Sequence, residues 1–88
     1  MKVILEIINE KGLHARASAK LVELVEDHNA DAKISKDGIT VSGDSIMGLL
    51  MLSASKGSKI EVQTTGIEKK KLILEIKNLI MNKFGEQD

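Results

Sequence analysis

Two stretches of the chain, residues 2–8 and 59–65, alternate between apolar and polar positions. Successive side chains of a β-strand point to opposite faces, so this alternation is typical of a strand with one buried face. The positions expected on the buried face are Val3, Leu5 and Ile7 in the first stretch and Ile60, Val62 and Thr64 in the second. The pattern therefore predicts two strands that each pack on a core from one side.

A third stretch, residues 31–42, predicts an antiparallel hairpin, because apolar and polar residues alternate on both sides of the dipeptide Asp37-Gly38. An Asp-Gly pair favours the two-residue type I′ turn, which needs positive φ at both central positions. The apolar positions are Ala32 and Ile34 before the turn and Ile39 and Val41 after it.

Three further stretches carry apolar residues at the three- and four-residue spacing of an amphipathic helix. They are residues 16–27, 45–54 and 68–84. Ser45 or Asp44 is expected to cap the second helix, because a side-chain oxygen there accepts a hydrogen bond from the first helical turn. The residues expected to face the core are Ala17, Leu21, Leu24 and Val25 in the first helix, Leu49 and Leu52 in the second, and Leu72, Ile76, Leu79, Ile80 and Phe84 in the last.

In chain order these elements read β-α-β-β-α-β-α. Strands interleaved with helices through short connections predict an α+β fold with the helices on one face of a sheet. The chain has 88 residues, which is the usual size of one domain, so residues 1–88 are expected to fold together.

The composition excludes several classes of function. With 13 basic and 13 acidic residues the net charge is zero, and no Trp or Tyr is available to stack on bases, so nucleic acid is not an expected partner. The absence of cysteine excludes disulfides and cysteine-ligated metals. No signal peptide is visible and no apolar run approaches the roughly 18 residues of a membrane span, so we expect a cytoplasmic protein without membrane insertion.

The candidate chemistry lies in residues 12–16, Gly-Leu-His-Ala-Arg, at the start of the first predicted helix. The N–H groups of a first helical turn lack intrahelical acceptors and carry partial positive charge, so they bind phosphate readily. The guanidinium of Arg16 offers a planar set of donors that suits phosphate oxygens. The candidate phosphate-binding residues are therefore His14, Ala15, Arg16 and Ala17, with His14 as the nucleophile. On physical grounds alone, a solvated loop histidine is the more common interpretation of such a residue.

Residues 12–16 resemble the phosphorylation motif of HPr, the histidine phosphocarrier family of the bacterial phosphotransferase system. A second segment, residues 45–50 with the sequence Ser-Ile-Met-Gly-Leu-Leu, is similar to the family's second-helix motif, including its regulatory serine position. The likeness covers essentially the whole chain. It implies an open-faced β-sandwich, in which a four-stranded antiparallel sheet is covered on one face by three helices.

The resemblance also implies the chemistry. His14 would accept a phosphoryl group on Nδ1 from phospho-Enzyme I, which phosphoenolpyruvate charges, and donate it to an Enzyme IIA protein. Arg16 matches the family arginine and would contact the phosphoryl group during transfer. Such a chain is a carrier and not an enzyme, it requires no metal or other cofactor, and a monomer is its expected state. One position departs from the family pattern, since Ala17 stands where a proline usually fixes φ at the helix start.

The second helix is apolar around nearly its whole circumference, although a helix on one face of a sheet buries only one side. An exposed, methionine-rich patch suits docking to partner proteins, and the family uses this helix for that purpose. Ser45 is expected to cap the helix, and by the resemblance it is also the serine that HPr kinase/phosphorylase modifies in some bacteria, which would put negative charge into the patch. The residues expected in the patch are Ile46, Met47, Leu50 and Met51.

Two alternatives stay open. Residues 48–52 and 55–57 are similar to the nitrogen-related branch of the family, the NPr type, which serves metabolic regulation without sugar transport. A small α+β regulatory binding module without covalent chemistry would explain the fold and the apolar patch, but it leaves His14 and Arg16 as a coincidence. His28 has no obvious partner in the sequence, and we assign it no role.

Overall fold

The predicted order of strands and helices is confirmed in the structure, a computed structural model that describes residues 1–87. The strands and helices, with a final single turn of 3₁₀-helix, are β1 (Lys2–Glu6), α1 (Ala15–Glu26), β2 (Asp31–Lys36), β3 (Ile39–Ser42), α2 (Ile46–Met51), β4 (Lys59–Thr65), α3 (Lys69–Met81) and η1 (Lys83–Gly85).

The four strands form one sheet in the order β1-β4-β2-β3, and every neighbouring pair is antiparallel. A row of apolar side chains crosses the sheet, because Val3 pairs with Val62, Val62 with Ile34, and Ile34 with Val41. Residues directly opposite each other on neighbouring strands project to the same face, so this row belongs to the buried face of the sheet.

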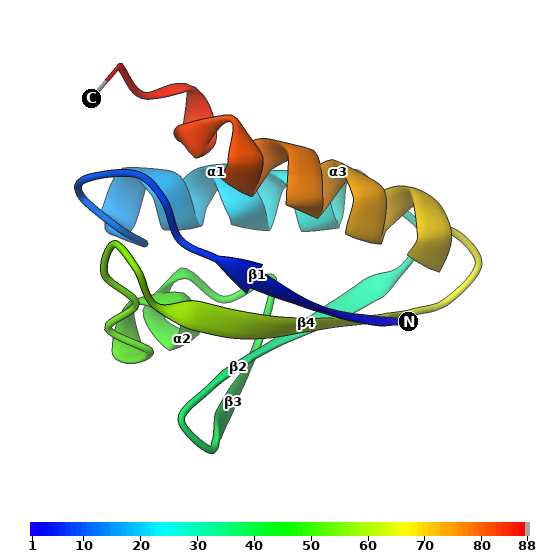
Figure 1. The fold of residues 1–88 in the computed structure, drawn as a ribbon. Coiled ribbons are helices and arrows are strands. Elements are labelled where there is room, and N and C mark those ends of the chain that lie inside the picture. Colours follow the sequence, from blue (N-terminus) through cyan, green and yellow to red (C-terminus); the bar gives the residue numbers. More distant parts are fainter. Residues whose placement is uncertain (88) are drawn as a thin grey trace.

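Helices α1 and α3 lie side by side across the sheet, and α2 lies close to the loop that leads into α1 (Figure 1). One apolar core joins the sheet to all three helices. Its fully buried members include Ile34, Ile60 and Val62 from the sheet and Leu21, Leu49, Leu72, Ile76 and Phe84 from the helical side. The alternation and helical spacing of the apolar residues therefore predicted the buried faces, although Ile39 of the hairpin is 50% exposed.

The hairpin between β2 and β3 has the predicted turn. Asp37 has a φ of 50° and Gly38 a φ of 83°, which is the pair of positive values that defines a type I′ turn.

Two helices are shorter than the sequence pattern predicts. Helix α2 ends at Met51 rather than at residue 54, and Ser53 has a left-handed φ of 52°. Helix α3 ends at Met81 rather than at Phe84, since Lys83 and Phe84 have φ values of 54° and 55°. A left-handed residue cannot continue a right-handed helix. Phe84 is buried as predicted, but it reaches the core from a turn and not from the helix.

Candidate functional site

The loop between β1 and α1 is held against the segment that follows α2. The N–H of Leu13 donates to the carbonyl oxygen of Ala54 at 2.8 Å, and the N–H of Gly12 donates to that of Asn9 at 3.1 Å. Gly12 has a φ of +65°, and a Cβ at this position would lie 2.5 Å from the carbonyl oxygen of Ala54. Only glycine fits so close an approach with a left-handed backbone.

His14 directly follows this loop and caps α1. Its backbone is extended, with φ −75° and ψ −178°, and its carbonyl oxygen accepts the N–H of Ser18 at 2.8 Å. The imidazole Nδ1 accepts the backbone N–H of Arg16 at 3.3 Å. An imidazole thus performs the capping role that Ser, Thr, Asp or Asn usually performs.

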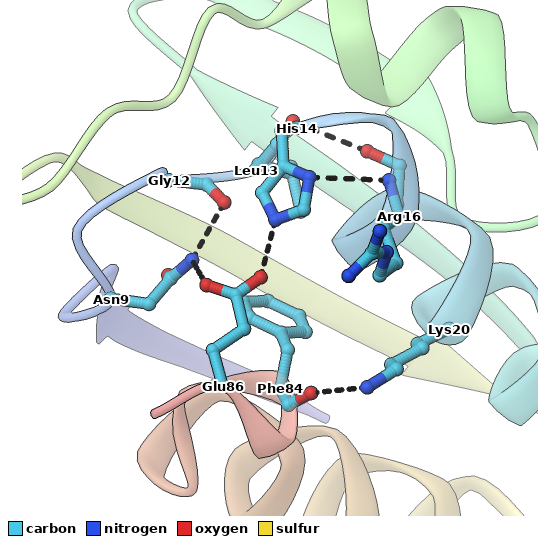
Figure 2. A network of polar contacts seen from close by, with 9 residues as sticks. Asn9, Gly12, Leu13, His14, Arg16, Lys20, Phe84 and Glu86 are labelled. Atoms are coloured by element: carbon cyan, nitrogen blue, oxygen red, sulfur yellow. Dashed lines mark hydrogen bonds and ion pairs between the residues drawn. The ribbon is translucent and has the colours of Figure 1, made fainter. Parts of the chain in front are cut away.

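The other ring nitrogen of His14 contacts a carboxylate from the C-terminal segment (Figure 2). Nε2 lies against Oε2 of Glu86, while Oε1 of Glu86 accepts a hydrogen bond from Nδ2 of Asn9 at 3.0 Å. The amide nitrogen of Asn9 also donates to the carbonyl oxygen of Gly12 at 2.8 Å. The side chains of His14 and Glu86 are 27% and 16% exposed, so the ring is only partly open to solvent.

These contacts fix the tautomer of a neutral His14 ring. A backbone N–H can only donate, so Nδ1 must present its lone pair to Arg16. The ring proton is then on Nε2, where it donates to the carboxylate of Glu86. Nδ1 is consequently the ring nitrogen that carries the lone pair.

The C-terminal segment is anchored where it brings Glu86 to the ring. Nζ of Lys20 on α1 donates to the carbonyl oxygen of Phe84 at 2.6 Å, and the Phe84 side chain is buried in the core. Sequence reasoning missed Glu86, because it lies 72 residues from His14 and no local pattern connects the two.

Three basic side chains lie on the solvent side of the site. A surface depression of about 320 Å³ is lined by Lys11, Arg16 and Lys20, together with the carboxylates of Glu10 and Glu86 and residues 85 and 87. The side chain of Arg16 is exposed, and no carboxylate within residues 1–87 forms an ion pair with its guanidinium. That guanidinium is therefore available to an incoming anion.

The four predicted phosphate-binding residues lie together at the start of α1. Ala15 and Arg16 are exposed and Ala17 is buried in the core. The N–H groups of Ala15 and Ala17 belong to the first helical turn, where the helix provides no acceptor for them. This end of α1 carries the partial positive charge of the helix dipole.

The predicted docking helix α2 exposes most of the residues assigned to its patch. Met47 and Met51 are 71% and 69% exposed, Ile46 is also exposed, and Leu50 is half-buried. Leu49 and Leu52 are buried, as predicted. The capping residue is Ser45 and not Asp44, since Oγ of Ser45 accepts the N–H of Gly48 at 3.0 Å.

His28, to which the sequence assigned no role, has two partners in the structure. Its Nδ1 donates to the carbonyl oxygen of Leu24 at 2.7 Å, and its Nε2 contacts the carboxylate of Glu75 on α3. These two contacts, the first with the larger effect, raise the pKa of His28 above its usual 6.5. Glu75 lies 47 residues away in the sequence, so helical spacing could not reveal the pair.

The described part of the chain has neither a metal-binding cluster of side chains nor a membrane-spanning helix. Within it, no three His, Asp or Glu side chains gather in a way that could hold a metal ion. None of its helices is both long and apolar enough to cross a bilayer.

Comparison with known proteins identifies the family. Residues 1–82 match the family described as the PTS HPr component phosphorylation site. The phosphocarrier protein HPr of Neisseria meningitidis is 41% identical over 86 residues, which are 98% of this chain and 97% of that protein. The phosphocarrier protein NPr of Escherichia coli is 34% identical over 87 residues, again 98% and 97% of the two chains.

Solved structures agree with the sequence comparisons. The crystal structure of HPr-C-His from Thermoanaerobacter tengcongensis superposes with a TM-score of 0.95 at 33% identity and covers 100% of this chain and 99% of its own. The match extends over the sheet, all three helices and the C-terminal turn. The chain belongs to the HPr family, the non-enzymatic phosphoryl carriers of the phosphotransferase system.

Proposed function

We propose that Nδ1 of His14 is the atom that accepts the phosphoryl group. The observation that carries this proposal is that the two ring nitrogens have different contacts. Nδ1 presents a lone pair beside the start of α1, and Nε2 contacts the carboxylate of Glu86. A phosphoryl group attached to Nδ1 lies at the N-terminus of α1. There the N–H groups of the first turn and the positive end of the helix dipole favour its negative charge.

The neighbouring residues stabilise the group during transfer. Phosphoryl transfer spreads negative charge over the equatorial oxygens, so positioned donors provide most of the catalysis. The Arg16 guanidinium supplies a planar pair of N–H donors, and the backbone N–H groups of Ala15 and Ala17 supply two more. The side chain of Arg16 is exposed, which lets it orient toward that group.

We propose phospho-Enzyme I as the donor and Enzyme IIA proteins as the acceptors. The docking surface consists of α2 and the start of α1, because the backbone bond from Leu13 to Ala54 holds the His14 loop against the segment after α2. Ile46, Met47, Leu50 and Met51 form the apolar part of that surface. Methionine side chains adapt to differently shaped partners, as a carrier that meets two of them requires.

Ser45 is a candidate regulatory site on the same surface. Its hydroxyl is half-buried and caps α2, and Met47 follows two residues later. A phosphate on Ser45 places up to two negative charges at the edge of the docking surface and repels acidic partners. We expect HPr kinase/phosphorylase with ATP to add an acid-stable phosphoryl group that Ser45→Ala lacks. If a kinase that phosphorylates the HPr of its own organism fails to modify this protein, the regulatory role of Ser45 is contradicted.

The sugar-transport branch and the nitrogen branch use the same site. The greater identity to an HPr than to an NPr favours the sugar branch for this chain. Discharge of the phosphorylated protein by Enzyme IIA proteins of either type distinguishes them, and faster discharge by the nitrogen type would overturn the assignment.

The acceptor role is tested by incubating the protein with phosphoenolpyruvate and Enzyme I and recording its intact mass at neutral pH. We expect a gain of one phosphoryl group that acid removes and that His14→Ala abolishes. His28→Ala, which removes the other histidine of the chain, should still be phosphorylated. If the mass does not increase with an Enzyme I that phosphorylates the HPr of its own organism, the proposed function is contradicted.

A further inference from the structure

We propose that Glu86 is a positioning residue that holds the ring proton of His14 on Nε2 and balances the positive charge that the ring acquires when it is phosphorylated. This inference rests on the proposed function of His14. It assigns a role to a carboxylate that lies outside the phosphorylation motif and comes from the opposite end of the chain.

The backbone around Glu86 adopts an unfavourable conformation to bring it to the ring. Lys83, Phe84 and Gly85 have φ values of 54°, 55° and 78°, and two of these three left-handed residues carry a Cβ. Such residues cost free energy and persist where the surrounding structure holds them in place. The bond from Lys20 to the carbonyl oxygen of Phe84 and the burial of the Phe84 ring hold this turn.

A buried amide orients the carboxylate from the other side. Asn9 is fully buried, and its Nδ2 donates both to Oε1 of Glu86 and to the carbonyl oxygen of Gly12. Both neighbours are acceptors, so the amide nitrogen, and not the amide oxygen, must face them. Within residues 1–87 the Oδ1 atom of Asn9 finds no hydrogen-bond partner. The contacts of the amide nitrogen with Glu86 and Gly12 therefore determine the orientation of the Asn9 side chain.

The transfer step shows what the carboxylate does. The lone pair of Nδ1 forms the new N–P bond as the bond between phosphorus and the donor atom of phospho-Enzyme I breaks, and the electron pair of the broken bond stays with that donor atom. The His14 ring keeps its proton on Nε2 and becomes a cation. When the acceptor takes the phosphoryl group, the electron pair of the Nδ1–P bond returns to Nδ1 and the ring is neutral again. No proton has to enter or leave, provided that Nε2 keeps its proton throughout.

Glu86 favours the cationic, phosphorylated ring over the neutral one, because a carboxylate attracts an imidazolium more strongly than an imidazole. A charge-assisted hydrogen bond in a partly exposed site changes an equilibrium by about tenfold. We therefore expect loss of Glu86 to lower the phosphorylated fraction at equilibrium, beyond any change in rate.

The test is a competition between two carriers in one tube. Wild-type protein labelled with ¹⁵N and unlabelled Glu86→Ala are mixed with limiting phosphoenolpyruvate and a catalytic amount of Enzyme I, and mass spectrometry measures the phosphorylated fraction of each. Enzyme I only catalyses the exchange, so differences in docking do not affect the final ratio. We expect the ratio of phosphorylated to unphosphorylated protein to be about tenfold higher for the wild type.

Two further variants separate charge from shape. Glu86→Gln keeps a hydrogen-bond acceptor without the charge and should lose most of the same advantage. Glu26→Gln removes an exposed carboxylate at the other end of α1, and it should match the wild type. A ratio near one for Glu86→Ala, wild-type behaviour of Glu86→Gln, or an equal loss in Glu26→Gln would each overturn the inference.

A measurement on the unphosphorylated protein keeps this inference separate from the proposed function. Long-range ¹H–¹⁵N spectra should place the ring proton of His14 on Nε2, and this proton should exchange with water more slowly than in Glu86→Ala. Equal exchange in the two proteins overturns the role of Glu86, whatever Enzyme I does. Failure of Enzyme I to charge even the wild type, with slow exchange observed, overturns the proposed function alone.

Discussion

His28 and Glu75 join the end of α1 to the middle of α3. The Nε2 atom of His28 contacts the Glu75 carboxylate, and its Nδ1 lies 2.7 Å from the carbonyl oxygen of Leu24. Both ring nitrogens donate when both contacts are made, so the imidazolium is the form that fits. The carbonyl of Leu24 and the hydrogen bond to Glu75 raise the pKa of His28 most. Burial opposes them with a smaller effect, and the charges of Glu75 and Glu68 raise the pKa further.

This pair predicts a pH dependence of stability. The folded-state pKa of His28 is raised, so the contribution of the pair is fully present below the unfolded-state pKa of about 6.5 and is lost as the pH rises through the folded-state value. Urea unfolding of the wild type and of His28→Gln should show a difference in free energy that is largest below pH 6.5 and shrinks as the pH rises above that value. A difference that grows with pH would contradict the pairing.

Gly12 is expected to tolerate no side chain. Gly12→Ala combines a left-handed φ with a Cβ 2.5 Å from the carbonyl oxygen of Ala54. We expect a loss of about 2–4 kcal/mol in the free energy of unfolding, measured by urea titration, since both strain and a clash with backbone contribute.

Gly57→Ala is the matched control for this substitution. Gly57 has a φ of +92°, but a Cβ there would meet no atom within 4 Å. Its replacement should cost about 1–2 kcal/mol, the strain alone. Equal losses at the two positions would show that the Ala54 contact contributes nothing.

The sequence predicted those parts of the fold that depend on neighbouring residues. Alternation identified the buried faces of the strands, and Asp37-Gly38 identified the turn, because a two-residue loop with two positive φ values accepts few other pairs. Residues 12–16 also revealed the start of α1 and the imidazole there. These features are encoded within a few residues of one another.

The parts that the sequence did not reveal depend on distant residues. Glu86 contacts His14 across 72 positions, and Glu75 contacts His28 across 47. Helical periodicity extended α3 to Phe84, since residues 80 and 84 share a face of a regular helix, but the left-handed turn that buries Phe84 has no local signal. The contacts of Glu86 with Asn9 and His14 join distant parts of the sequence, so only the three-dimensional structure reveals them.

Arg16 is expected to act on transfer and not on folding. Its side chain is exposed and forms no ion pair with any carboxylate of residues 1–87, so Arg16→Ala should leave the free energy of unfolding within about 0.5 kcal/mol of the wild type. Rapid-quench measurement of transfer from phospho-Enzyme I should show a rate lowered by about 10- to 100-fold, the effect of losing charge-assisted hydrogen bonds.

Arg16→Lys tests the geometry of that interaction. Lysine keeps the charge but lacks the planar pair of donors, so its transfer rate should fall between those of the wild type and the alanine variant. A wild-type rate in Arg16→Ala would exclude contact between Arg16 and the transferred group.

The exposed methionines of α2 are expected to contribute to docking. Met47→Ser with Met51→Ser should raise the KM for the protein in Enzyme I phosphorylation by about tenfold or more, because burying one such side chain provides about 1.5–3 kcal/mol. Folding stability should change little, because both side chains are largely exposed. The control is Leu74→Ser, which removes a 57% exposed apolar side chain from α3. An equal rise in KM for the control would show that general surface hydrophobicity, and not α2, determines docking.

The atom that carries the phosphoryl group is the most direct test of the site. The protein, labelled with ¹⁵N at histidine and charged by phosphoenolpyruvate and Enzyme I, should show coupling between ³¹P and the Nδ1 of His14, with the proton retained on Nε2. His28 should show no such coupling, since both of its ring nitrogens donate hydrogen bonds within the fold and leave no lone pair for phosphorus. Coupling to Nε2 of His14, or to either nitrogen of His28, would contradict the assignment of Nδ1 as the phosphoryl acceptor.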